Sequence, residues 1–287
     1  VDEYQRGIVD YFAGAYWPAI AAFERYLEGK PATQADDAQY YLAASYASLS
    51  MPAEAMAAYQ KVIDLYPTSD LVGEAWLARA RQIGRSGDIE GARAAYQEYA
   101  RRYPTTSLAP RALLTRAGLA EDAGQLERAA REYCALAEAY PLSAQGATAR
   151  QRAGLILYRL GEHADAVSVW EALAVQTTNQ DTRLEALFWA GKARLALQDA
   201  AGAAEALRKV AASAPLHYYG QRAAALLPGT PTPAWSLLVG KTQEEAEDWL
   251  MGWSGVTQEM LAQGAPAEVQ ANAKWARGQE LRSLGLL

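Results

Sequence analysis

The chain has 287 residues, of which 51% are apolar and 21% charged, and 27 basic against 33 acidic side chains give a formal net charge of −6. This balance excludes a disordered chain, which needs low hydrophobicity and high net charge, and a nucleic-acid groove, which needs clustered Lys and Arg. Alanine, the strongest helix former, supplies 63 residues, so we expect an all-α chain.

No apolar stretch approaches the roughly 18–20 residues of a membrane-spanning helix, so no membrane span is expected. Cys134 is the only cysteine, which excludes an internal disulfide and a cysteine-based zinc site but does not decide the redox compartment. The chain opens Val1-Asp2-Glu3 without methionine or a signal-like segment. We therefore expect a processed or trimmed protein, and an exported precursor stays open.

A repeat of about 37 residues runs from the first residue to about residue 215. Five prolines that end apolar stretches are separated by 36, 37, 37 and 74 residues: Pro31, Pro67, Pro104, Pro141 and Pro215. Three further columns keep the step: Ala55, Ala92, Ala129, Ala166 and Ala203; Tyr59, Tyr96, Tyr133, Trp170 and Leu207; and Gly7, Ala43, Ala80, Ala117, Gly154 and Gly191. Turn residues occupy another: Gly14, Ser50, Gly87, Gly124, Gly161 and Gln198. A fixed period of this length indicates a repeat architecture, here with six repeats.

One repeat shows the local logic. Apolar residues at 3–4 spacing predict a helix over residues 71–85, which Gly87-Asp88 ends, and Asp88 is a candidate N-cap for the next helix. That second helix is predicted over residues 89–102 and ends before Pro104, because proline has no amide to donate. Each repeat is thus predicted to be a helical hairpin.

Such a hairpin cannot bury both faces alone, so it is expected to stack on its neighbours. Small residues at Ala80 and Ala92 predict a close approach of two helices, and Tyr96 is expected to pack against the next unit. Burial of such a ring contributes about 2–3 kcal/mol, which favours a core role for the aromatic column.

The pattern of Ala80, Ala92, Tyr96 and Pro104 resembles that of tetratricopeptide repeats. The period of 37 exceeds the usual 34 of that family, which implies longer links between hairpins. The longer form, with Tyr-Pro closing the second helix, resembles repeats of bacterial envelope proteins, including outer-membrane assembly lipoproteins and partners of the Tol–Pal system. The resemblance implies an α-solenoid of about six hairpins.

A second resemblance begins where the repeats stop, at Leu216-His217-Tyr218-Tyr219-Gly220. A repeat helix precedes this sequence and an Ala-rich helix follows it. The sequence is similar to a motif in the non-catalytic helical region of soluble lytic transglycosylases. These enzymes cleave the glycan strands of peptidoglycan. Residues 188–194, with Phe188 and Trp189, resemble the preceding helix of that family, and residues 277–286 resemble its linker helix, which ends at Leu-Gly-Leu.

The prolines 228, 231 and 233 mark a break after which three short helices are predicted, over residues 243–251, 257–262 and 266–284. Trp249, Trp253 and Trp275 are expected to pack them together. We therefore divide the chain into superhelical repeats over residues 1–215, and a Tyr-Tyr-Gly corner with a small helical linker domain over residues 216–287.

No catalytic site is predicted. The transglycosylase family carries a catalytic Glu-Ser motif and a Gly-Leu-Met-Gln segment, and neither occurs here, so the catalytic domain of that family is absent from this sequence. His163 and His217 do not have metal-ligand spacing, so neither a metal nor a cofactor is expected. There is no Gly-Lys-Ser/Thr loop and no Gly-x-Ser-x-Gly elbow.

Two functional hypotheses remain open. In the first, the chain is the scaffold of a lytic-transglycosylase-like protein, which positions a catalytic domain on peptidoglycan in the periplasm. Glycan would stack at His217, Tyr218, Tyr219 and Trp189, unless the tyrosines only cap the array.

In the second hypothesis, the chain is a stand-alone envelope adaptor that binds a peptide or protein in a groove of first-helix residues, such as Trp76, Arg79 and Arg116. Its oligomeric state is not determined by the sequence.

Overall fold

The computed structural model describes residues 2–31 and 33–227. This part of the chain is all-α, with thirteen helices and no strand, as the sequence predicts. The helices are α1 (Glu3–Phe12), α2 (Tyr16–Glu28), α3 (Ala35–Ser48), α4 (Pro52–Leu65), α5 (Val72–Arg85), α6 (Ile89–Arg102), α7 (Leu108–Asp122), α8 (Leu126–Ala139), α9 (Ala144–Leu160), α10 (His163–Gln176), α11 (Gln180–Ala196), α12 (Ala200–Ser213) and α13 (Tyr218–Leu226).

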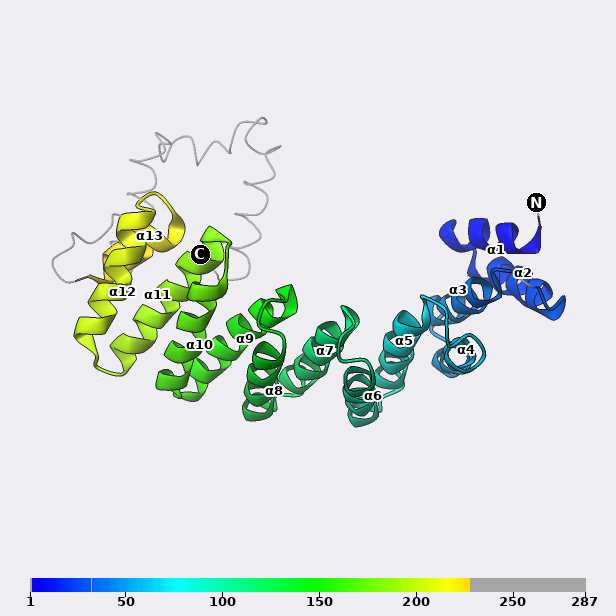
Figure 1. The fold of residues 1–287 in the computed structure, drawn as a ribbon, viewed down its shortest axis with the longest axis horizontal. Helices are drawn as coiled ribbons and strands as arrows, with labels where there is room; N and C mark the ends of the chain where they lie inside the picture. Colours follow the sequence, from blue (N-terminus) through cyan, green and yellow to red (C-terminus); the bar gives the residue numbers. More distant parts are fainter. Residues whose placement is uncertain (1, 32, 228–287) are drawn as a thin grey trace, which may run out of the picture. The chain divides into compact units, whose positions relative to one another are not determined.

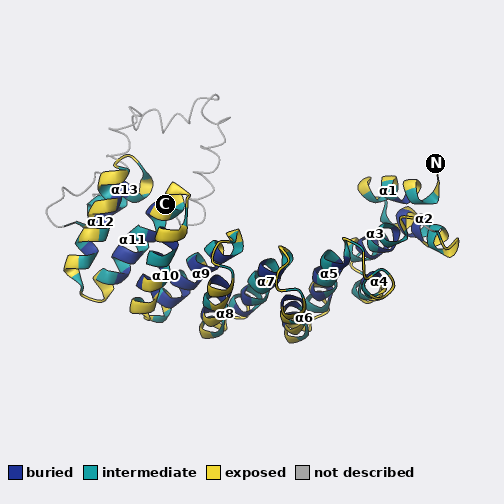
Figure 2. Ribbon diagram, in the orientation of Figure 1, coloured by how far each residue is buried: buried dark blue, intermediate teal, exposed yellow. Residues whose placement is uncertain are grey.

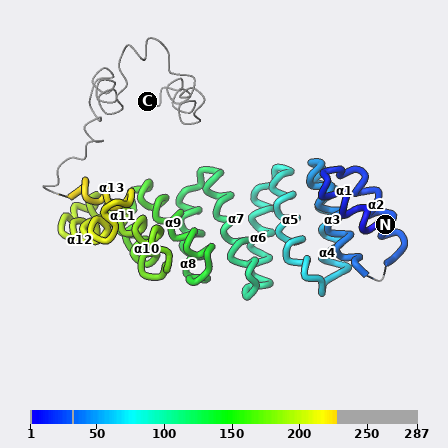
Figure 3. The backbone as a smooth tube through the Cα atoms, turned by 90° about the horizontal axis from the view of Figure 1, so that it is seen from above, coloured from blue at the N-terminus to red at the C-terminus, as the bar shows by residue number. Residues whose placement is uncertain are grey.

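The first twelve helices form six hairpins that follow one another side by side in chain order (Figures 1 and 3). Each helix packs mainly on the helix before it and the helix after it, which is the nearest-neighbour packing of a solenoid. The odd-numbered helices from α1 to α11 are the first helices of their hairpins. Several odd-numbered helices, α13 included, also contact a neighbouring odd-numbered helix directly. The predicted solenoid of six hairpins is confirmed.

The turn inside each hairpin has a residue in the left-handed region. Four are glycines with φ between +72° and +98°: Gly14, Gly87, Gly124 and Gly161. Ser50 and Gln198 occupy the same slot with φ of +58° and +61°. Asp88 caps α6 as predicted, because the Gly91 amide donates to its carboxylate at 2.8 Å.

The core lies between the helices, where buried residues form stripes along their facing sides (Figure 2). The large column predicted from the sequence is at most 4% exposed at every member, from Tyr59 to Leu207. A second buried column escaped our sequence analysis. It repeats every 37 residues on the first helices and is at most 1% exposed throughout: Ala38, Ala75, Ala112, Ala149, Ala186 and Ala223.

The last member of that column, Ala223, lies on α13, which therefore occupies the place of a seventh first helix. Gly220 supports this, because a Cβ atom there would strike the carbonyl oxygen of Ala214, just as one at Gly146 on α9 would strike that of Tyr140. Each of these carbonyls belongs to the residue before a proline. Gly220 is thus needed for close approach of two backbones.

The predicted division of the chain after Pro215 falls just before α13, whereas the compact unit that holds the hairpins runs to Leu227. In the structure α13 packs on α11 and α12. The three predicted helices of the linker domain, its tryptophans and the Leu-Gly-Leu ending lie outside the described residues.

Candidate functional site

Two grooves open on the first-helix face, the side of the array formed by the first helices. The α3–α7 groove has a volume of about 680 Å³. Its lining comes mainly from α3 and α5, with contributions from α1, α4, α7 and the turn between α3 and α4: Tyr11, Tyr40, Ala44, Ala47, Ser48, Ser50, Pro52, Tyr59, Glu74, Ala78, Arg81, Gln82, Arg85 and Arg111.

The α3–α7 groove is polar and carries an excess of positive charge. Three arginines face a single carboxylate there, and Arg111 Nη1 and Nη2 donate to the two oxygens of Glu74 at 2.8 and 3.2 Å. Arg81 and Arg85 form no ion pair with any described carboxylate. Burial raises the pKa of Tyr96, and the Arg81 guanidinium next to it acts in the opposite direction. The groove therefore offers two cations to a ligand.

The second, α7–α11 groove has a volume of about 730 Å³ and a more apolar lining. Residues from three first helices line it: Glu121 on α7, Thr148, Gln151, Arg152, Leu155, Ile156, Tyr158 and Arg159 on α9, and Trp189 and Lys192 on α11. The Lys192 ammonium lies 4.5 Å from the centroid of the Trp189 ring and 5.6 Å from that of Tyr158. These are cation–π distances, so the lysine is held against the aromatic wall.

Polar side chains also cross from one first helix to the next. Arg111 reaches Glu74, Arg152 Nη1 donates to Glu121 at 3.1 Å, and Gln151 Nε2 donates to Glu185 at 2.7 Å. Exposed ion pairs of this kind contribute only about 0.2–1 kcal/mol each. These contacts link each first helix from α5 to α9 to the next first helix along the two grooves.

The residues predicted to line a groove, Trp76, Arg79 and Arg116, line neither of the two. Trp189, predicted at the glycan-stacking corner, lines the α7–α11 groove. Trp76 is half-buried and packs near Tyr99, with ring centroids 6.4 Å apart. Its indole nitrogen is buried and has no hydrogen-bond partner among the described residues.

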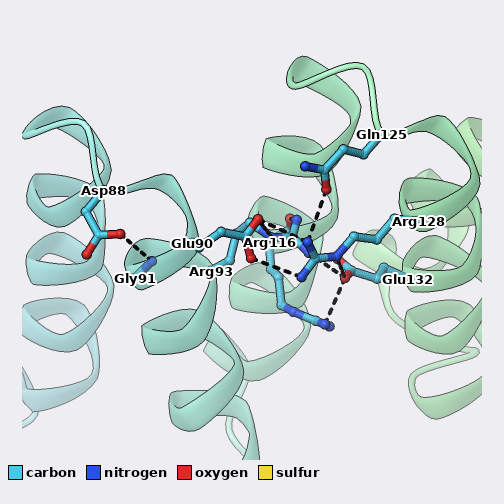
Figure 4. Close-up of polar contacts among 8 residues, drawn as sticks. All are labelled: Asp88, Glu90, Gly91, Arg93, Arg116, Gln125, Arg128 and Glu132. Carbon is cyan, nitrogen blue, oxygen red and sulfur yellow. Dashed lines mark hydrogen bonds and ion pairs between the residues drawn. The ribbon is translucent and has the colours of Figure 1, made fainter.

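Arg116 belongs instead to an ion cluster that joins α6, α7 and α8 (Figure 4). At its centre Arg93, 2% exposed, donates from Nη1 to the Arg116 carbonyl at 2.6 Å and from Nη2 to Glu132 at 2.5 Å. Arg116 and Arg128 also pair with Glu132, at 2.8 and 3.3 Å. Burial lowers the pKa of Arg116, and Glu132 opposes that shift. The cluster connects two hairpins.

The three residues of the predicted Tyr-Tyr corner have different environments. The Tyr219 amide donates to His217 Nδ1 at 3.2 Å, so the imidazole caps α13, and His217 Nε2 lies 3.4 Å from Asp181. Tyr219 packs on Phe188 with centroids 5.4 Å apart, and burial together with the nearby Glu185 carboxylate raises the pKa of Tyr219 to about 12. Tyr218 is 64% exposed. Only Tyr218 presents most of its ring to solvent.

Among residues 2–31 and 33–227, no group of three or more His, Cys, Asp and Glu side chains is arranged to hold a metal ion. Within the same described stretches, no helix is both long and apolar enough to cross a bilayer. The chemistry that the two grooves offer is binding, through guanidinium, ammonium, hydroxyl and aromatic groups.

The sequence analysis missed the groove residues Arg81, Arg85, Tyr158 and Lys192. Their signal was in the repeat, because the residues that line the grooves keep the 37-residue step. One such column runs through Ala44, Arg81, Leu155 and Lys192, and another through Ser48, Arg85 and Arg159. The 37-residue step therefore places these groove residues on one face of the first helices.

Comparisons with known proteins agree with this architecture. Tetratricopeptide repeat families match residues 37–69, 77–144 and 185–217. The C-terminal part of a tetratricopeptide repeat-containing protein from Cytophaga hutchinsonii is similar in structure, with a TM-score of 0.52 and 14% identity, over 96% of this chain and 98% of that one. Two other solved structures are also similar. MamA has a TM-score of 0.45 and 18% identity, over 61% of this chain and 89% of that one. Pseudomonas aeruginosa pilF has a TM-score of 0.44 and 14% identity, over 77% of this chain and 94% of that one. No curated protein sequence matches significantly.

Proposed function

We propose that this chain, a helical-repeat protein of the tetratricopeptide type, is a scaffold that binds a segment of a partner protein along its first-helix face. One observation carries the proposal. Two grooves of about 680 and 730 Å³ lie next to each other on that face and share α7, with Arg111 in one and Glu121 in the other.

The groove side chains explain why a chain segment fits. Arg81, Arg85 and Arg159 extend from the helices without an ion pair to any described residue. Residues 111 and 121 on α7 are ten residues apart, which is about 15 Å along a helix. About five residues of extended peptide span that distance. A partner segment of ordinary length can therefore contact both grooves.

The test is a selection from a library of displayed 12-residue peptides against the folded chain. Selected peptides are expected to bind the parent chain with a 1:1 stoichiometry in calorimetry. Binding should be lost in Lys192→Glu and Arg85→Glu, which reverse charge inside the grooves. Lys209→Glu, on the exposed side of α12, is the matched control and should bind as the parent does. Failure to select any peptide would overturn the proposal.

A second candidate is the scaffold of a lytic-transglycosylase-like protein, which rests on the Tyr-Tyr-Gly resemblance. Its structural support is the position of Tyr218, whose exposed ring contacts Tyr219 at 5.1 Å, while Tyr219 in turn lies beside Glu185 on α11. Glycan strands stack on accessible aromatic rings of this kind. A location in the bacterial periplasm belongs to the same proposal.

The second candidate is tested by co-sedimentation with purified peptidoglycan sacculi. Retention that Tyr218→Ala loses would favour it, because this variant removes the accessible ring and leaves Tyr219 and the His217 cap in place. Leu226→Ala, at the other end of α13, is the control. If the parent chain stays in the supernatant, the peptidoglycan proposal is wrong, and the peptide scaffold is unaffected.

A further inference from the structure

The α3–α7 groove is positively charged within a negatively charged protein. The whole chain has a net charge of −6, whereas the groove lining contains three arginines and one glutamate, a local charge of +2. The electrostatic potential of a concave surface lined by charges of one sign attracts ligands of the opposite sign. The charge of the groove is thus opposite to that of the chain as a whole.

The one carboxylate of the groove is already in use. Both oxygens of Glu74 accept hydrogen bonds from Arg111, so Glu74 does not neutralise Arg81 or Arg85. These two lie four residues apart on α5 and are both exposed. Like charges at this spacing face the same side of a helix and destabilise it. Arg81 also lies beside Tyr96 on α6, but no described carboxylate neutralises either arginine, so the pair costs the fold stability.

Neutral hydroxyl groups line the same groove as the two arginines. They belong to Tyr40 and Tyr59, whereas the Ser48 hydroxyl already donates to the Ala44 carbonyl at 2.9 Å. Burial raises the pKa of both tyrosines above the ordinary value, so their hydroxyls stay protonated at neutral pH and can donate to an anion. Guanidinium groups and hydroxyls are groups that bind carboxylates. An arginine can donate two parallel hydrogen bonds to the two oxygens of one carboxylate.

We propose that the α3–α7 groove binds an acidic segment of the partner, whose Asp or Glu carboxylates pair with Arg81 and Arg85. The inference rests on the proposed peptide scaffold and names the chemistry of its ligand. The neighbouring α7–α11 groove, with Leu155, Tyr158 and Trp189, takes a large apolar side chain of the same segment. Nucleic acid is disfavoured, because its affinity needs many clustered cations along a phosphate backbone.

The experiment uses the peptides selected on the parent chain. The tightest binder is compared with a variant peptide in which every Glu is Gln and every Asp is Asn, and with a single-stranded DNA of equal charge. The protein variants are Arg81→Gln with Arg85→Gln, and Arg208→Gln as the control, since Arg208 is exposed on α12 and has no ion pair among the described residues. Circular dichroism establishes that each variant is folded.

Selected peptides are expected to be enriched in Asp and Glu. The amide peptide, and the Arg81→Gln/Arg85→Gln protein, should each bind at least about tenfold more weakly, because a hydrogen bond to a charged group is lost. Arg208→Gln should bind as the parent does, and binding should weaken as salt rises from 50 to 200 mM.

The contrary outcomes are distinct. Neutral peptides that bind equally well to the parent and to Arg81→Gln/Arg85→Gln would overturn the acidic-segment inference and leave the scaffold standing. Tighter binding of the DNA than of the peptide would also overturn it. Absence of any selected peptide would instead remove the scaffold proposal on which it rests.

Discussion

The indole of Trp170 on α10 packs directly on the backbone of α9 at Gly154, where a Cβ atom would lie 2.5 Å from its Cε2 and Nε1. Two other hairpins repeat the relationship, with Gly7 facing Phe23 and Gly191 facing Leu207. In the three hairpins whose large residue is Tyr59, Tyr96 or Tyr133, the facing position is alanine. Tyrosine therefore faces alanine in all three cases, whereas glycine faces a tryptophan, a phenylalanine or a leucine, so the small partner depends on how closely the large residue approaches and not on its size alone.

We expect Gly154→Ala to destabilise the array by about 1–2 kcal/mol, because the clash with a buried ring costs more than the roughly 1 kcal/mol that alanine gains over glycine in a helix. Gly118→Ala is the matched control, since a Cβ there would lie 3.6 Å from the Tyr133 hydroxyl, an ordinary contact. It should stabilise the chain slightly. Urea unfolding followed by circular dichroism measures both, and equal effects would contradict this account of the packing.

The turn column gives a second prediction. Gln198→Gly should raise the free energy of unfolding by about 0.5–1 kcal/mol, because Gln198 has φ of +61° and the relief of left-handed strain exceeds the extra chain entropy of glycine. Gly161→Ala should lower it by a similar amount, since Gly161 has φ of +82° and open space around it. Thermal melts of the two variants should shift in opposite directions, and shifts of the same sign would count against the argument.

The Arg93 cluster predicts a large asymmetry. Glu132→Ala should cost about 3–5 kcal/mol, because it leaves the buried Arg93 guanidinium with only one carboxylate partner among the described residues, the exposed Glu90 at 3.4 Å from its Nε. The double variant Arg93→Met/Glu132→Leu should recover much of that loss, since apolar residues of similar volume do not have to be desolvated as ions. A double-mutant cycle of Arg93→Met, Glu132→Leu and their combination, followed by urea unfolding, measures the coupling, and simple additivity would show that the pair is not coupled.

Alkaline stability depends on Tyr46, whose hydroxyl donates to Glu24 at 2.8 Å. Burial and that hydrogen bond raise the pKa of Tyr46 to about 12, above its ordinary value of 10. The contribution is therefore complete below pH 10 and is lost as pH rises from 10 to 12, because the unfolded chain ionises first. Tyr46→Phe should reduce the fall in melting temperature over that window. Tyr218→Phe, at an exposed ring, should leave it unchanged.

The sequence predicted the fold well because the features that end helices are local. Prolines, turn glycines and Asp88 act within a few residues, so the expected helix over residues 89–102 is confirmed at Ile89–Arg102, and the one over 71–85 begins one residue later, at Val72. The place of α13 was harder to predict, because it depends on the close approach of Gly220 to Ala214 and on the packing of Ala223 against the preceding hairpin. The sequence signal for this packing is the 37-residue step of the alanine column, which a comparison of neighbouring residues does not show.

The binding face was predicted less well, for a physical reason. Arg79 and Arg116 were chosen because they are charged residues on first helices. Their column continues through Ala153 and Ala190, which are fully buried, so it faces the packed side of the helix. Arg81 lies two residues after Arg79, about 200° further round the helix, and is exposed in the groove. Charge alone does not tell these two faces apart.

The buried alanine column has a consequence for how this molecule can change in length. From α3 onward, each first helix presents the same buried alanine to the hairpin before it, from Ala38 to Ala223, so inserting or deleting one whole period leaves each remaining junction with a compatible neighbour. The two grooves share α7, so a period inserted between them would part Glu121 on α7 from Arg152 on α9 and alter a groove lining. A period inserted after α12 would instead lengthen the array and leave unchanged the distance between the two anchor points that a partner must bridge.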